Sequence, residues 1–265
     1  MPPVNGLLES RVANSDSHAI FAGPEFKHWA EDEGMIPPVE FLLGQYFHPD
    51  RTTLEAGTAG GHVLRALAER GFKDLSGFDY VSKLIDQARL KDQSGKLAFS
   101  VQDARKLTYP DESFEQLIYV GQVLCFINDA GGRRNAVAEA YRILKPGGVA
   151  VFSFLCLESR LQSAMHRALM GYLASFRTLT RSQQSQQQMP WLWVGNRFNI
   201  SALLDRPPHA YWYHYEEAAK LLLNQQFRIL GIGTRAQTDQ KRICESIEEF
   251  RRSPKTGMLY IVCQK

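Results

Sequence analysis

The feature that most constrains this chain is a glycine-rich turn between a short apolar segment and an amphipathic one. Residues 54–62 read Leu-Glu-Ala-Gly-Thr-Ala-Gly-Gly-His. Residues 52–54 are predicted to end a buried strand. From 63 to 67 apolar residues recur at helical spacing, and Gly71 then supplies a left-handed cap. In α/β proteins, a strand that turns into a helix through glycines brings the backbone close to a nucleotide-like ligand.

Carboxylates accompany three predicted strands. Glu55 lies at the carboxyl end of the first strand and is expected to face the cleft. Asp79 ends a strand over residues 75–79, and Asp103 ends a third over 99–103. Parallel strands with helices between them place these acids on one rim of the sheet. Asp79 lies about where a ribose-binding carboxylate falls in a dinucleotide-type unit. Glu55 would repel a pyrophosphate, so the turn favours a ligand without phosphate.

Two later segments extend the pattern. Residues 109–118 predict a turn into a fourth strand, and residues 140–148 predict a helix followed by a Lys-Pro-Gly-Gly turn into a fifth. From about residue 54 to residue 154 the chain resembles the class I S-adenosylmethionine-dependent methyltransferases. The resemblance implies an α/β fold, a Rossmann-like seven-stranded, mostly parallel sheet with helices on both faces. It also implies an antiparallel last strand and helical N-terminal and lid insertions.

The resemblance implies S-adenosylmethionine as the cofactor. In this family the first-strand acid and the glycines hold the methionyl part, and the second-strand acid binds the ribose hydroxyls. The third-strand acid contacts the adenine amino group. Residues next to two of the acids flank the adenine. The cofactor-binding residues expected by this carry-over are Glu55, Gly57, Thr58, Ala59, Gly61, Asp79, Tyr80, Asp103, Ala104, Gly121 and Gln122.

Ala59 departs from the family pattern, because it takes the place of the middle glycine and is followed by Gly60. The alanine methyl group is small, and it fits this turn if its φ is negative. We therefore expect an ordinary backbone conformation at Ala59.

The chain is long enough for one large domain with elaborations. We expect an N-terminal helical cap over residues 1–50, the cofactor-binding core over 51–154, a lid or substrate-binding insertion over 155–214, and the rest of the core over 215–265. Within these parts, residues 1–22 have weak periodicity and predict loose order. Residues 237–251 predict one helix, and 258–263 a final strand.

The segment from 191 to 215 is unusually aromatic. Core packing explains some of these rings, while others are expected to face an apolar, aromatic or cationic acceptor. Those expected to contact the substrate are Trp191, Trp193, Tyr211 and Tyr213.

The residue that would remove a proton from the acceptor is not identified by the sequence. Among the seven histidines, His28 and His214 are candidate bases, because they adjoin aromatic segments, although a structural role is an alternative for both. Histidines and acids do not cluster at metal-ligand spacing, so no metal is expected.

The composition and charge of the chain argue against nucleic acid and membrane as partners. A net charge of +3 is too small to indicate nucleic-acid binding, and the pairs 133–134 and 251–252 are expected to be solvated helix ends. An apolar run long enough to span a bilayer is missing, and the N-terminus lacks a signal-peptide pattern, so a cytoplasmic protein is expected. The four widely spaced cysteines are expected to be buried thiols.

The function expected from the sequence is methyl transfer to an O, N or C atom of a small organic acceptor. Modification of a lipid or macromolecule is an alternative, as is a non-catalytic partner protein with this fold. Oligomeric state is not addressed by the sequence.

Overall fold

The computed structural model describes residues 16–265. A seven-stranded sheet with the order β10-β11-β5-β4-β1-β2-β3 lies at its centre. Its strands are β1 Thr53–Ala56, β2 Leu75–Asp79, β3 Ala98–Val101, β4 Phe114–Tyr119, β5 Leu144–Phe154, β10 Arg228–Thr234 and β11 Leu259–Gln264. β11 is antiparallel to both neighbours, and the pairs from β3 to β5 are parallel. The expected fold class is confirmed, including the antiparallel last strand.

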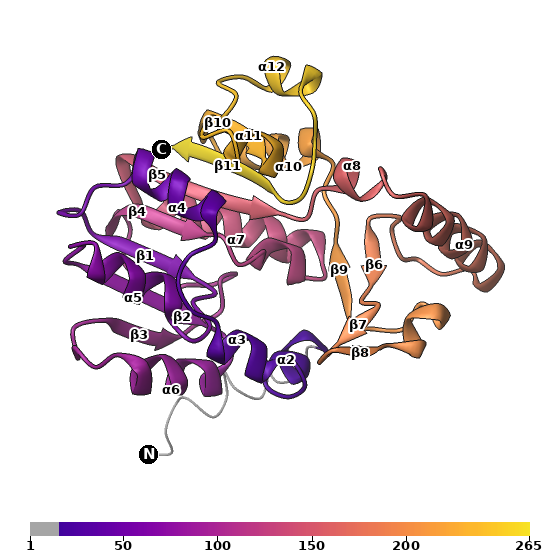
Figure 1. The fold of residues 1–265 in the computed structure, drawn as a ribbon, viewed down its shortest axis with the longest axis horizontal. Helices are drawn as coiled ribbons and strands as arrows, with labels where there is room; N and C mark the ends of the chain where they lie inside the picture. The colour runs from indigo at the N-terminus through magenta and orange to yellow at the C-terminus, as the bar shows by residue number, and fades with distance from the viewer. Residues whose placement is uncertain (1–15) are drawn as a thin grey trace.

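Helices cover both faces of this sheet, because each presents an apolar stripe to it. One apolar cluster joins the sheet to α4 Pro37–Tyr46, α5 His62–Glu69 and α6 Ser82–Lys91. A second cluster on the other face includes α7 Ala130–Ile143, α10 Tyr215–Leu223 and α12 Ile247–Arg252. Strands β1, β2, β4 and β5 all point toward the side where the helices α2 Asp16–Phe21 and α3 Phe26–Glu31 and the insertion lie (Figure 1).

The insertion between β5 and α10 has its own small framework. It contains α8 Leu157–Arg160, α9 Ala164–Thr180, β6 Gln188–Pro190, β7 Trp193–Val194, β8 Arg197–Phe198, the 3₁₀ helix η2 Ile200–Leu204 and β9 His209–Tyr211. β6 pairs with β9 and β7 with β8, both antiparallel. In Figure 1 this insertion extends beyond the ends of the central strands, with α9 furthest from the sheet.

The expectation of loose order over residues 1–22 is wrong for its last part. Residues Asp16–Phe21 form helix α2, which is followed by α3 Phe26–Glu31. Phe21 is buried and packs edge-on against Trp29 and Tyr80. The contact with Tyr80 joins segments far apart in sequence, so local periodicity could not predict it. Residues 1–15 lie outside the described part of the chain.

Two other expectations need correction. The helix expected over 237–251 is replaced by α11 Arg235–Thr238 and α12, because Cys244 between them exchanges two backbone hydrogen bonds of 2.8 and 3.0 Å with Ile232 of β10. The Lys-Pro-Gly-Gly turn lies inside β5 as a bulge, since the register with β4 jumps from Leu144 to Val149.

Burial of the cysteines agrees with the sequence: all four are buried free thiols. No helix within residues 16–265 has the length and apolar content needed to cross a membrane.

Candidate functional site

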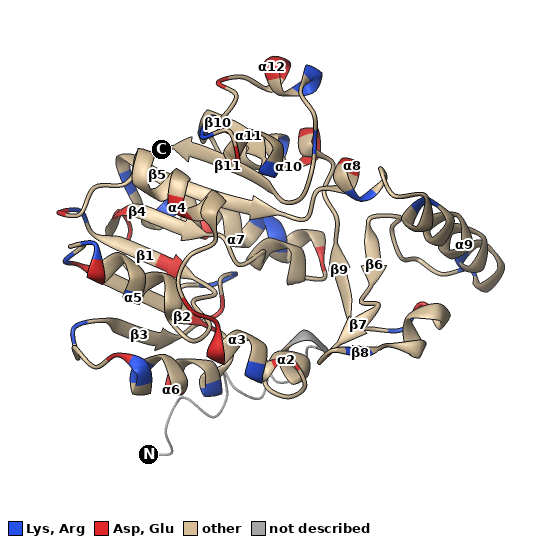
Figure 2. Ribbon diagram, in the orientation of Figure 1, with Lys and Arg blue, Asp and Glu red and all other residues tan. Residues whose placement is uncertain are grey.

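A cavity of about 160 Å³ opens at the carboxyl edge of the sheet. Its walls come from α2, α3, the glycine-rich turn, the ends of β2 and β3, and the segment that follows β4. Figure 2 shows acidic residues at the carboxyl ends of β1 and β2. The lining residues are Phe21, Trp29, Gly57, Ala59, Phe78, Asp79, Tyr80, Leu84, Gln102, Asp103, Ala104, Arg105, Gly121, Val123, Phe126, Ile127, Asn128 and Asp129.

The cavity brings together seven of the eleven residues expected to bind the cofactor: Gly57, Ala59, Asp79, Tyr80, Asp103, Ala104 and Gly121. The other four, Glu55, Thr58, Gly61 and Gln122, are not among the lining residues. Thr58 is buried, with its hydroxyl against Glu55, and the Gly61 backbone approaches the Phe99 ring. Gln122 begins the 3₁₀ helix η1 Val123–Phe126, and its N–H donates to the Ser153 hydroxyl.

The backbone N–H groups of the glycine-rich turn are used inside the protein. Thr58 N–H donates to the Phe78 carbonyl at 3.0 Å, and Gly61 N–H to the Thr58 carbonyl at 2.8 Å. Between them, Ala59 N–H donates to Asp79 Oδ2 at 3.1 Å and Gly60 N–H to the Trp29 carbonyl at 3.2 Å. A phosphate-binding turn needs such groups free and pointing at the anion. The geometry therefore disfavours a dinucleotide pyrophosphate.

Ala59 does not have the negative φ expected for it. Its φ is 48°, in the left-handed region, as are those of Gly57 and Gly61 at 63° and 75°. A side chain in this conformation costs about 1–2 kcal/mol. Two contacts offset this cost: the hydrogen bond to Asp79, and the packing of the methyl group in an apolar cluster with Phe21.

Asp79 is held rigidly at the end of β2. Its Oδ2 accepts from Ala59 N–H, and its Oδ1 accepts from Val81 N–H at 2.9 Å. Burial raises the pKa of Asp79 to about 6, although these backbone hydrogen bonds favour the charged form. A carboxylate that is oriented and poorly hydrated in this way is suited to accept hydrogen bonds from ligand hydroxyls.

Glu55 does not face the cavity as expected, because its buried side chain turns to the Thr58 hydroxyl and it is not among the lining residues. Its carboxylate accepts a hydrogen bond of 2.6 Å from the Thr58 hydroxyl, and it is 3% exposed. Burial raises its pKa to about 8, and the nearby Asp79 adds to the shift. Glu55 is therefore mostly protonated at neutral pH in the ligand-free protein.

This shift predicts a pH-dependent stability. Because the pKa of Glu55 is higher in the folded than in the unfolded chain, the folded state binds more protons between about pH 4.5 and 8. The Glu55 contribution is complete below that window and decreases as pH rises through it, by at most about 1.4 kcal/mol per pH unit. In Glu55→Gln, the free energy of unfolding measured in urea should decrease less between pH 6 and 8 than it does in the wild type. An equal dependence of unfolding free energy on pH in wild type and variant would contradict the raised pKa of Glu55. The control is Glu69→Gln, because Glu69 is exposed.

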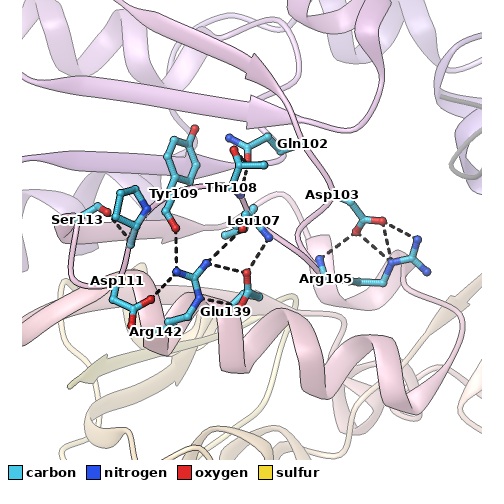
Figure 3. A network of polar contacts seen from close by, with 11 residues as sticks. Gln102, Asp103, Arg105, Leu107, Thr108, Tyr109, Asp111, Ser113, Glu139 and Arg142 are labelled. Atoms are coloured by element: carbon cyan, nitrogen blue, oxygen red, sulfur yellow. Dashed lines mark hydrogen bonds and ion pairs between the residues drawn. The ribbon is translucent and has the colours of Figure 1, made fainter. Parts of the chain in front are cut away.

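Asp103 is paired with Arg105, which also lines the cavity (Figure 3). The Arg105 Nε lies 3.0 Å from both carboxylate oxygens, and a terminal nitrogen lies 2.6 Å from Oδ2. This fork fixes the orientation of the carboxylate. Sequence reasoning did not find Arg105, because its spacing from Asp103 carries no motif.

Arg142 of α7 braces the loop that carries Asp103 (Figure 3). It donates to the Tyr109 carbonyl and to Asp111, both at 2.8 Å, and pairs with Glu139 at the same distance. Glu139 in turn accepts from Leu107 N–H at 2.7 Å. Hydrogen bonds from Arg142 are the main cause that lowers the pKa of Glu139. The loop between β3 and β4 is thus tied to a rigid helix.

The N-terminal helices supply an aromatic wall that the sequence did not reveal. Phe21 and Trp29 line the cavity together with Phe126 of η1. The Phe21 ring centroid lies 5.1 Å from that of Phe126, 5.6 Å from that of Trp191 and 5.8 Å from that of Trp29. Rings from three other segments therefore pack around Phe21.

The four aromatic residues expected to contact the substrate are placed differently from one another. Trp191 packs against two cavity-lining rings without lining the cavity itself. Trp193 is 62% exposed and contacts Phe198. Tyr211 and Tyr213 are buried in the main core.

Arg133 is not the solvated helix end expected from the sequence, since it is only 7% exposed. Its guanidinium lies 3.7 Å from the centroid of the Tyr211 ring. It also donates to the carbonyls of Ile127 and Asn128, at 2.9 and 3.0 Å, in the cavity wall. Arg133 thus links the insertion to this wall, a role that depends on Tyr211 of β9 lying against it.

Neither candidate base lines the cavity. His28 is exposed beside Trp29, and His214 forms a 2.9 Å contact with Glu158. Within the described residues no cluster of three or more His, Cys, Asp or Glu side chains could hold a metal ion.

Comparison with known proteins agrees with this geometry. Residues 54–152 match the methyltransferase domain family. The chain is 31% identical over 108 residues to a ubiquinone/menaquinone biosynthesis C-methyltransferase of Desulfotalea psychrophila, covering 40% of each protein. It is 31% identical over 121 residues to a malonyl-[acyl-carrier protein] O-methyltransferase of Serratia marcescens, covering 45% of each. The match thus spans less than half the length of these curated relatives.

Among solved structures, an S-adenosylmethionine-dependent methyltransferase from Methanosarcina mazei superimposes with a TM-score of 0.62 at 20% identity, covering 84% of this chain and 96% of the other. This similarity concerns the fold. Residues 54–152 thus match a methyltransferase domain, and the chain has the Rossmann-like fold of S-adenosylmethionine-dependent methyltransferases.

Proposed function

We propose that this protein transfers a methyl group from S-adenosylmethionine to an O, N or C atom of a small organic acceptor. The observation that supports it best is the cavity, where acids from the ends of β2 and β3 meet a glycine-rich turn whose amides are already used. The residues fit this cofactor, which carries ribose hydroxyls, an adenine amino group and no phosphate.

Different lining residues would bind different parts of the cofactor. Asp79 would accept hydrogen bonds from the ribose hydroxyls, and Asp103, held by Arg105, would face the adenine. Gly57 and Gly121 would let the backbone approach the methionyl part; the backbone at Gly57 is left-handed. When bound, the cofactor supplies a methyl group on a sulfonium, which is open to in-line displacement. Positioning of the reactants can contribute about 7–11 kcal/mol to such a reaction.

For the acceptor, we propose that residues 155–214 act as a lid. Two contacts support this. Trp191 packs on Phe21 and Phe126, and the Gln188 side chain donates to the Asn128 carbonyl at 3.0 Å in the cavity wall. An apolar aromatic wall exposes the reacting atoms to little water, which favours loss of the sulfonium charge.

Histidine is missing from the described lining of the cavity. We therefore propose an acceptor whose reacting atom needs no histidine base, such as a carboxylate oxygen or an acidic carbon. The two curated relatives named above are an O- and a C-methyltransferase, which is consistent with either choice.

Calorimetric titration tests the proposal. We expect S-adenosylmethionine and S-adenosylhomocysteine to bind with micromolar affinity and NAD not to bind, because the turn offers no free amides to a pyrophosphate. Absence of binding by both methionine-derived ligands would contradict the proposal and favour a non-catalytic partner protein. Where binding is found, a panel of small carboxylic acids and acidic carbon compounds should then reveal the acceptor.

A further inference from the structure

Two aromatic residues that line the cavity carry hydrogen-bond donors without partners. The Trp29 indole Nε1 and the Tyr80 hydroxyl are buried, and neither has a hydrogen-bond partner among the described residues. Buried polar atoms in folded proteins are nearly always paired, so an unpaired one calls for an explanation. On the wall of a ligand cavity, the simplest explanation is that the ligand supplies the acceptor.

Trp29 lies directly over the glycine-rich turn. Its carbonyl accepts the Gly60 N–H at 3.2 Å, and a Cβ on Gly60 would come within 2.5 Å of the Ala30 carbonyl oxygen. This close approach sets α3 against the turn. The Trp29 indole is therefore an additional donor beside a loop whose N–H groups from 58 to 61 are all engaged.

The charges around the cavity indicate which ligand atom this donor would meet. Three of the described lining residues are aspartates, and Arg105 is the only lysine or arginine among them. Arg105 forms an ion pair with Asp103, with a guanidinium nitrogen 2.6 Å from a carboxylate oxygen. An anionic group on a ligand would find no free cation here and would depend on neutral donors.

Tyr80 is the less suitable of the two donors for an anion. Burial raises the pKa of its hydroxyl, and the carboxylates of Asp79 and Asp103 raise it further. The Tyr80 hydroxyl thus lies in a negative field, which disfavours a second negative group beside it. The Trp29 indole N–H, in contrast, is a donor that cannot itself ionise at ordinary pH.

We infer that the Trp29 indole N–H binds the carboxylate of the amino-acid part of S-adenosylmethionine. This inference rests on the proposed function. The carboxylate is the only anionic group of that molecule, and a hydrogen bond from a buried neutral donor to an ionised acceptor is among the stronger kinds.

Two ligands and two variants test the inference by calorimetry. S-adenosylhomocysteine has the carboxylate, whereas 5′-methylthioadenosine has the same nucleoside without it. Trp29→Phe removes the N–H and retains an aromatic ring. The matched control is Trp191→Phe: Trp191 Nε1 is also buried without a partner and its ring also packs on Phe21, but Trp191 does not line the cavity.

We expect Trp29→Phe to weaken S-adenosylhomocysteine binding by about tenfold or more and to leave 5′-methylthioadenosine binding within about twofold. Trp191→Phe should change neither. The inference is overturned if Trp29→Phe leaves S-adenosylhomocysteine binding unchanged, if it weakens both ligands equally, or if both variants lose affinity alike, since packing would then be the cause. Failure of the wild type to bind either ligand would instead overturn the proposed function, and the inference with it. Thermal unfolding of each variant checks that the fold is retained.

Discussion

Asp79→Asn is expected to lower the affinity for S-adenosylmethionine by about 100-fold while the protein remains folded. Both oxygens of Asp79 accept backbone N–H groups, one from Ala59 and one from Val81. An asparagine has only one oxygen, so its amide nitrogen must face one of these donors. The turn would shift, and the charged acceptor proposed for the ribose hydroxyls would be lost as well.

Stability should fall less than affinity in this variant. An unpaired N–H costs about 1–3 kcal/mol. However, burial raises the pKa of Asp79 to about 6. At neutral pH the side chain is still mostly ionised, but its ionisation costs more free energy in the folded state than in the unfolded chain. Removing the charge relieves that penalty and offsets part of the cost. Because the Asp79 contribution to stability decreases as pH rises through about 6, the relief should be larger at pH 8 than at pH 5.

Calorimetry for binding and urea unfolding for stability separate the two effects. The control is Asp86→Asn on α6, because the Asp86 side chain is 66% exposed and its ion pair with Arg89 is long, at 3.5 Å. Affinity of Asp79→Asn within about threefold of wild type would show that this carboxylate does not hold the ligand.

Arg177→Met is expected to destabilise the insertion by about 3–5 kcal/mol. The side chains of Arg177 and Asp205 are only 3% and 4% exposed, and their closest atoms are 2.6 Å apart. Arg177 also donates to the carbonyls of Ser185 and Gln188. One side chain thus joins α9, the polar loop that follows it, β6 and the end of η2. Its loss would leave the Asp205 carboxylate buried with only His209 beside it at 3.3 Å.

The pKa of Asp205 gives a second readout. Burial alone would raise it, but the hydrogen bonds and charge of Arg177 outweigh burial and hold the pKa below its usual range. The pair therefore stabilises the protein above the ordinary pKa of an aspartate, and that stability is lost as pH falls through the lower, folded-state pKa. Without Arg177, the pKa of Asp205 should rise above its usual value.

Hydrogen exchange across residues 164–211 and urea unfolding measure the effect. In the double variant Arg177→Met, Asp205→Asn, part of the stability should return, because no buried charge remains unpaired. Asparagine is chosen because residue 205 has a φ of 51°, which asparagine tolerates. Arg181→Met, at the exposed end of α9, is the control. If Arg177→Met matched this control, the pair would be shown to contribute little.

Local patterns were sufficient for most of the central sheet. The alternation of apolar strands, amphipathic helices and glycine turns identified the elements from β1 to β5 in their order, although α7 begins at Ala130 and β5 at Leu144, both earlier than expected. The family resemblance added the antiparallel insertion of β11. The helix expected over 237–251 failed because a single pairing between Cys244 and Ile232 interrupts it. Such a pairing satisfies backbone groups across the fold and overrides local helical preference.

In the candidate site, too, some features could be predicted from local sequence and others could not. Glycines and acids at strand ends could be found from sequence, because the carboxyl ends of parallel strands meet at one edge whatever the details of packing. The left-handed φ of Ala59 could not be predicted from the sequence, because it depends on a hydrogen bond to the Asp79 carboxylate, twenty residues later in the chain.

By itself, then, the sequence indicated the fold class and the edge of the sheet where a ligand would bind, because these follow from periodicity, from residues close together in the chain and from the family resemblance. The tertiary structure alone decided which side chains complete the walls: Phe21 and Trp29 from the N-terminal helices, Arg105 on Asp103, and buried Arg133 beneath the insertion. Their roles depend on contacts between segments far apart in sequence. Distances of that kind are set by how the elements pack, and no local pattern records them.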